Sequence, residues 1–125
     1  MIAHLLATIA VFALTTQPAP TASDASAVVA GATASVYLVI NNPTMYDIYV
    51  TSATSEVAAK VELCSADKAI DDLTVASYGS LELKAGGMFL RLSGMKRELK
   101  AGESIAVTMM TDGGVTIVAT AVVKP

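Results

Sequence analysis

Apolar and polar residues alternate along most of the chain after residue 27, which is typical of strands with one buried face. Asn, Pro, Gly and Asp interrupt the alternation at spacings near those of antiparallel all-β proteins. No apolar stripe with helical spacing is long enough to connect parallel strands. We therefore predict an all-β fold, an antiparallel sandwich or barrel, with seven or eight strands. The clearest are residues 34–40, 47–53, 57–63, 81–83, 88–92, 105–110 and 115–123.

The same period of two predicts which side chains share a face. In segment 57–63, the four odd-numbered residues Val57, Ala59, Val61 and Leu63 are expected on one face, opposite Lys60 and Glu62. Met109 and Met110 are adjacent and are expected on opposite faces. The sequence Asp112-Gly113-Gly114 predicts a hairpin turn between the last two strands.

The N-terminal segment differs from the rest. Ile2 to Leu14 is almost continuously apolar, and the first charged residue is Asp24. Thirteen helical residues span about 20 Å, which is short of a hydrocarbon core of about 30 Å. We predict a signal peptide over residues 1–25 and one domain over residues 26–125, although the expected Lys or Arg is missing. A buried N-terminal helix is the alternative.

This prediction makes the protein periplasmic or secreted, without stable membrane insertion once the signal is removed. No cysteine lies directly after the apolar run, so a lipoprotein anchor is not expected. The only histidine is His4, so the mature chain would lack imidazole. Histidine-assisted nucleophilic catalysis and zinc-histidine sites are thereby excluded, and no nucleotide or hydrolase motif is present. We expect no enzyme.

Composition narrows the function further. The 125 residues are 54% hydrophobic and 15% charged, which excludes a disordered chain and fits one domain. The net charge of −3 argues against a nucleic-acid partner. A single cysteine excludes a disulfide framework and zinc motifs with several cysteines.

Soft metal ligands are the first candidate chemistry. Cys64 and the methionines after residue 25 are the kinds of donor that select Cu(I). A lone cysteine is most often a buried, inert thiol, and methionine commonly fills cores. A free thiol in an exported protein is nevertheless exposed to oxidants, so a ligand or redox role for Cys64 stays open.

Two charged clusters have simpler interpretations. The acids within residues 67–72 lack the spacing of a calcium loop, which favours a solvated loop. Lys96, Arg97 and Lys100 form a basic cluster that is either a solvated turn or a docking patch for a partner.

Four segments resemble the PCu(A)C-type periplasmic copper chaperones: Val36–Pro43, Val61–Leu63, Leu81–Gly87 and Gly94–Glu103. The resemblance implies a cupredoxin-like, Greek-key β-sandwich. It also implies, for the family, a surface site that holds Cu(I) and transfers it to a copper-accepting protein such as a cytochrome oxidase subunit.

The ligand motif of that family is His-x10-Met-x21-His-x-Met, and the resemblance places Cys64, Phe89 and Arg91 at the first His, the second His and the last Met. The intervening loop is shorter by about eight residues, and no family ligand is retained. Phe89 offers no lone pair, and Arg91 places a permanent positive charge where a cation would bind. Cys64 is the candidate metal ligand, and a methionine from a loop, such as Met45, is the expected second donor.

Two functions follow. The first is a copper-chaperone-like protein that binds Cu(I) weakly or atypically and aids metal delivery to cytochrome oxidase. The alternative is a divergent, metal-free β-sandwich module that recognises another exported protein.

Overall fold

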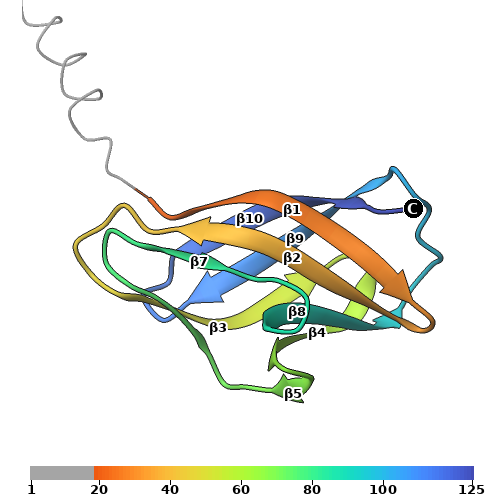
Figure 1. Ribbon diagram of the computed structural model, residues 1–125, viewed down its shortest axis with the longest axis horizontal. Coiled ribbons are helices and arrows are strands. Elements are labelled where there is room, and N and C mark those ends of the chain that lie inside the picture. Colours follow the sequence, from red (N-terminus) through yellow and green to blue (C-terminus); the bar gives the residue numbers. More distant parts are fainter. Residues whose placement is uncertain (1–18) are drawn as a thin grey trace, which may run out of the picture.

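A computed structural model describes residues 19–125, and over this range it contains strands and no helix (Figure 1). The ten strands are β1 (Thr21–Ala30), β2 (Thr33–Asn41), β3 (Ile48–Ser55), β4 (Ala58–Ser65), β5 (Lys68–Ala69), β6 (Leu73–Val75), β7 (Ser80–Glu82), β8 (Met88–Met95), β9 (Ser104–Thr111) and β10 (Thr116–Val123). The expected all-β fold is confirmed. The seven predicted segments correspond to β2, β3, β4, β7, β8, β9 and β10, and the three further strands are β1 and the short strands β5 and β6, of two and three residues.

The strands form one sheet in the order β5-β4-β8-β2-β1-β10-β9-β3-β6, and β7 pairs with β2 beside this path. β3 also pairs with β4, through Ala53 and Val61, so the sheet closes into a flattened barrel. Figure 1 shows β1 and β2 passing in front of β9 and β10. One pair departs from the expected antiparallel arrangement, because β1 runs parallel to β10 with Ser26 opposite Val122. The Greek-key connection stays a prediction.

The core forms where the predicted alternation points inward. In β10, Ile117, Ala119, Ala121 and Val123 are buried, whereas the residues between them face solvent. The largest fully buried side chains come from β2, β6, β8, β9 and β10 and from the segments beside them: Leu38, Ile40, Leu73, Leu83, Leu90, Leu92, Ile105, Met109 and Ile117. The predicted hairpin joins β9 to β10, and Met109 is buried while Met110 is exposed, as expected.

The expectation for segment 57–63 is wrong at Ala59. Ala59 is exposed and its neighbour Ala58 is buried, although β4 and β8 keep a regular register from Ala58–Met95 to Cys64–Phe89. Alanine is small enough to lie on the buried or the exposed face, so the positions of Ala58 and Ala59 in the sequence do not show which of the two is buried. Val57 and Leu63 are buried as predicted.

β1 begins at Thr21, before the predicted domain start at residue 26. Its pairing with β2 shifts between Ser23 and Ser26, and Asp24 lies in this irregularity with φ of 53°. The apolar run of the predicted signal peptide lies outside the described residues, so its boundary stays a prediction. Among the described residues, no helix has the length and apolarity to span a membrane.

Candidate functional site

The three positions singled out by the family motif lie side by side on the outer face of the barrel. Cys64 of β4 pairs directly with Phe89 of β8, and Arg91 is opposite Glu62 two residues further along the same two strands. Side chains two apart on a strand share a face, so Cys64, Phe89 and Arg91 form one group. Their neighbours Leu63 and Leu90 point the other way, into the core.

Cys64 has no exposed surface, although it lies outside the main core cluster. Phe89 covers it from one side and the two-residue strand β5 pairs with β4 on the other, with Ala69 opposite Cys64. Its Sγ donates a weak hydrogen bond to the carbonyl oxygen of Glu62 at 3.9 Å. Burial raises the pKa of the Cys64 thiol, and the nearby Arg91 charge only partly opposes this. The thiol is therefore protonated at neutral pH, whereas metals bind the thiolate.

Phe89 and Arg91 fill the space beside this thiol. The Arg91 guanidinium carbon lies 5.5 Å from the centre of the Phe89 ring, and the Tyr37 ring lies 6.3 Å away at a tilt of 59°. Arg91 also contacts Asp67 in the β4–β5 turn, at 3.6 Å to the carboxylate and 3.4 Å to the carbonyl oxygen. The Arg91 guanidinium is thus paired with Asp67 and the Phe89 ring, at a position where the family has a metal ligand.

The methionines lie elsewhere. Met88 and Met109 pack on the core, and Met110 faces solvent from β9. Met95 is opposite Ala58, six residues along β4 from Cys64, which corresponds to about 20 Å. Met45, proposed as a partner for Cys64, belongs to the β2–β3 loop, which is hydrogen-bonded to the β6–β7 turn.

This donor set does not fit a Cu(I) site at the family's positions. One buried thiol, an aromatic ring and an ion-paired guanidinium supply one soft donor and one permanent cation. Within residues 19–125, no three His, Cys, Asp or Glu side chains are grouped closely enough to hold a metal ion.

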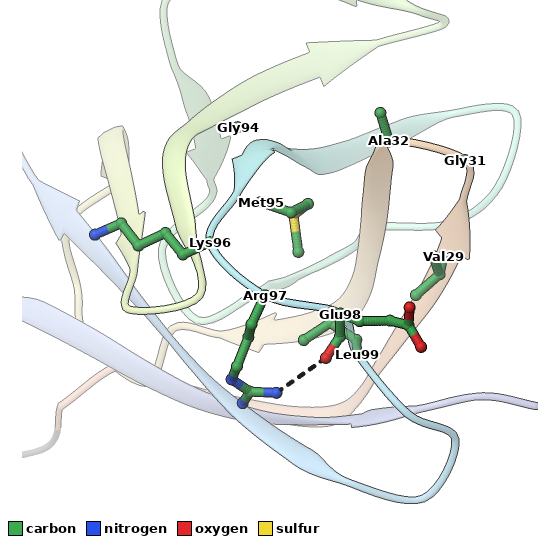
Figure 2. A pocket seen from close by; sticks show the side chains of 9 residues that line it. All are labelled: Val29, Gly31, Ala32, Gly94, Met95, Lys96, Arg97, Glu98 and Leu99. Carbon is green, nitrogen blue, oxygen red and sulfur yellow. Dashed lines mark hydrogen bonds between the residues drawn. The ribbon is translucent and has the colours of Figure 1, made fainter.

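The basic cluster forms an internally bonded turn between β8 and β9 (Figure 2). Arg97 pairs with Glu103 at 2.7 Å, and Glu103 accepts a hydrogen bond from the backbone N–H of Lys100 at 2.6 Å. These contacts lower the pKa of Glu103, with the backbone hydrogen bond as the main cause. Figure 2 shows the Lys96 side chain pointing away from Met95. The arrangement is that of a solvated turn, one of the two expected outcomes.

A shallow cleft of about 540 Å³ lies beside this turn. It is lined by Val29, Gly31, Ala32 and residues 94–99, which come from the end of β1, the β1–β2 turn, the end of β8 and the turn that follows β8 (Figure 2). Met95 is the one soft donor in its lining, which contains no cysteine or histidine.

The acids within residues 67–72 do not converge either. Asp67 is occupied by Arg91, while Asp71 and Asp72 are exposed just before β6. This agrees with the predicted solvated loop.

Sequence reasoning missed the role of Asn42, which it treated only as one of the polar residues that interrupt the alternation. Asn42 is 2% exposed, and its side-chain amide donates to the carbonyl oxygens of Tyr46 (2.7 Å), Val75 (3.1 Å) and Ala76 (3.2 Å). Its Oδ1 accepts from the N–H (3.0 Å) and hydroxyl (2.7 Å) of Thr44. Asparagine before proline signals a local turn, which is the only sequence cue to this network.

The sequence also matches a known protein family. The family described as LpqE-like matches residues 10–123, nearly the whole chain. The chain belongs to the LpqE-like family. No curated protein matches the sequence of this LpqE-like chain.

Solved structures agree on the fold. A copper-bound PCuAC domain from PmoF2 has a TM-score of 0.74 at 13% identity, covering 82% of this chain and 90% of that one. The apo PCuAC domain from PmoF1 has a TM-score of 0.69 at 20% identity, with coverages of 85% and 90%. Cu(I)-DR1885 from Deinococcus radiodurans has a TM-score of 0.70 at 25% identity, with coverages of 90% and 82%. This LpqE-like chain therefore has the fold of PCuAC domains, as its sequence resemblance implied.

Proposed function

We propose that this protein is an exported, copper-chaperone-like module that recognises another exported protein and holds no Cu(I) on the outer face of β4 and β8. One observation supports this most directly. Cys64 has no exposed surface, and its neighbours at the other two family positions are Phe89 and an Arg91 that is paired with Asp67. The fold is kept, while its outer face offers a metal only one protonated thiol.

Metal binding by the purified domain tests the proposal. The wild type is titrated with Cu(I) in the presence of a competing chelator, beside Cys64→Ala and a triple variant with Cys64→His, Phe89→His and Arg91→Met. We expect the wild type and Cys64→Ala to behave alike. The triple variant places the family's ligand types, two imidazoles and a thioether, at three neighbouring positions and serves as the positive control. Stoichiometric copper in wild-type protein purified from its own compartment would contradict the proposal.

Cu(I) carriage through Cys64 is the second candidate function. It is supported by a soft donor at a family ligand position and by copper in two domains of similar fold, PmoF2 and DR1885. In this case the protein would bind Cu(I) weakly and pass it to a copper-accepting protein such as an oxidase subunit. Competition-resistant Cu(I) binding that is lost in Cys64→Ala would establish this candidate in place of the first.

Export is also part of the proposal. The apolar run before residue 15 supports it, and the match to the LpqE-like family includes part of that run. Cys64 is not a lipid attachment site, because it lies buried within β4. Fractionation of cells that express the tagged full chain, with mass determination of its N-terminus, tests both export and the predicted cleavage near residue 25. Recovery of uncleaved protein in the cytoplasm would contradict export.

A further inference from the structure

Three loops meet at the end of the barrel opposite the β1–β2 turn, at the left of Figure 1. They are residues 42–47 between β2 and β3, residues 76–79 between β6 and β7, and residues 112–115 between β9 and β10. The first two are joined by hydrogen bonds from the Asn42 N–H to the Gly79 carbonyl (2.8 Å) and from the Tyr78 N–H to the Thr44 carbonyl (3.0 Å). Asp112 attaches the third by donating its N–H to the Tyr49 carbonyl at 3.0 Å.

The loops carry exposed large side chains. Tyr46 and Tyr78 are each 71% exposed and Met45 is 61% exposed, the highest values among the large apolar side chains described. Tyrosine and methionine are enriched where proteins bind one another. A neighbouring cleft of about 250 Å³, lined by Tyr46, Ile48 and Val115 among others, extends this apolar surface.

These side chains are held on a fixed backbone. Asn42 is buried below them with all of its polar atoms bonded, and the Asp47 carboxylate accepts from the N–H of Ser77 at 2.9 Å. Tyr78 has a φ of 56°, a left-handed conformation in which a glycine would be less strained. The sequence thus places an exposed aromatic ring at a strained position, and strain of this kind is concentrated at binding sites.

The charges around the patch have one sign. Asp47 and Asp112 are exposed at the rim of the cleft, and the three loops contain no Lys or Arg. The opposite end of the barrel holds Lys96, Arg97 and Lys100. Carboxylates beside tyrosine rings suit a cationic side chain, since they combine charge pairing with cation–π contact.

We propose that this surface, which we call the tyrosine end (residues 42–47, 76–79 and 112–115), binds a basic segment of a partner protein, with its Arg or Lys side chains on the tyrosine rings and its apolar side chains in the cleft. The inference rests on the proposed function, because it locates the recognition surface and names the chemistry of the partner.

The probe is a synthetic seven-residue peptide in which arginine alternates with leucine and valine. It is titrated into isotope-labelled protein and followed by NMR, beside a matched peptide with citrulline in place of arginine. We expect shift changes at the tyrosine end and binding at least about tenfold weaker for the citrulline peptide. Binding of equal strength by both peptides, or shifts confined to other surfaces, would overturn the inference.

Variants separate the role of the rings from folding. Tyr78→Gly removes a ring and suits the backbone there, so it is expected to weaken binding by about fivefold without lowering the melting temperature. Asp112→Asn should weaken binding and reduce its salt dependence. Lys96→Ser, at the opposite end, is the matched control and should bind like the wild type. Unchanged binding in Tyr78→Gly, or self-association that buries the tyrosine end, would refute the proposed partner.

This result is independent of the copper titration. If the protein binds neither the peptide nor copper, only the proposal for the tyrosine end is rejected. Tight stoichiometric copper would reject the proposed function itself.

Discussion

Asn42 should contribute far more to stability than an ordinary loop residue. Its amide group has two hydrogens for the carbonyl oxygens of Tyr46, Val75 and Ala76, while Oδ1 accepts twice from Thr44. Asn42→Ala leaves the buried carbonyl of Val75 without this donor, which costs about 1–3 kcal/mol. The remaining bonds are partly buried and are worth about 1 kcal/mol each, with water replacing some of them.

We therefore expect Asn42→Ala to lower the free energy of unfolding by about 3 kcal/mol, and the melting temperature by about 15 °C. Urea unfolding and calorimetry measure the two quantities. The adjacent Asn41 is exposed, so Asn41→Ala is the matched control and should change stability by less than about 0.5 kcal/mol. A loss below about 1 kcal/mol in Asn42→Ala, or an equal loss in the control, would refute this account of the network.

Three further predictions follow from local geometry. Gly94→Ala should lower the free energy of unfolding by about 2 kcal/mol, because φ is 62° and the new Cβ would lie 2.8 Å from the Cβ of Ala59. Gly102→Ala is the control: its φ is 88° but the space around it is open, so the same urea assay should show a loss of only about 1 kcal/mol. Glu103→Gln should make the melting temperature fall less steeply below pH 4.5. The contacts that lower the pKa of Glu103 stabilise the native state, and this stabilisation is lost as the pH falls, because the carboxylate of the unfolded state is protonated before that of the native state. An unchanged dependence of the melting temperature on pH would contradict the role given to these contacts. Cys64 should react with Ellman's reagent only on unfolding, and rapid reaction in the native state would contradict its burial. The difference in stability between the wild type and Cys64→Ala should narrow above pH 9.0, because the thiol of the unfolded state loses its proton before the native thiol does.

The sequence predicted the long strands because their side chains alternate strongly. β2 and β10 bury every second residue, and the Asp-Gly-Gly turn between β9 and β10 falls where expected. β1 was harder to predict because its residues are mostly small or polar, and its position depends on β2 and β10 rather than on its own apolar pattern.

The candidate site was predictable in position and not in detail. The resemblance of the surrounding segments placed Cys64, Phe89 and Arg91 at the family's ligand positions, and cross-strand pairing shows that they are neighbours. The exposure of Cys64 could not be predicted, because it depends on the Phe89 ring and on β5, a strand of two residues with no pattern of its own. The tyrosine end escaped prediction because its loops meet only through contacts distant in sequence.

The parallel pairing of β1 with β10 has a consequence for how the chain folds. Ser26 and Val122 are 122 − 26 = 96 positions apart, and bringing such distant segments together costs about 4 kcal/mol of loop-closure entropy. Contacts of high sequence separation form late, so closure of the barrel is expected to be the slow step. A chain whose last strand has not yet paired keeps an open sheet, with β1 as one of its two unpaired edges beside the gap. The kink at Asp24 and the small polar side chains around it make that edge a poor template for aggregation during the delay.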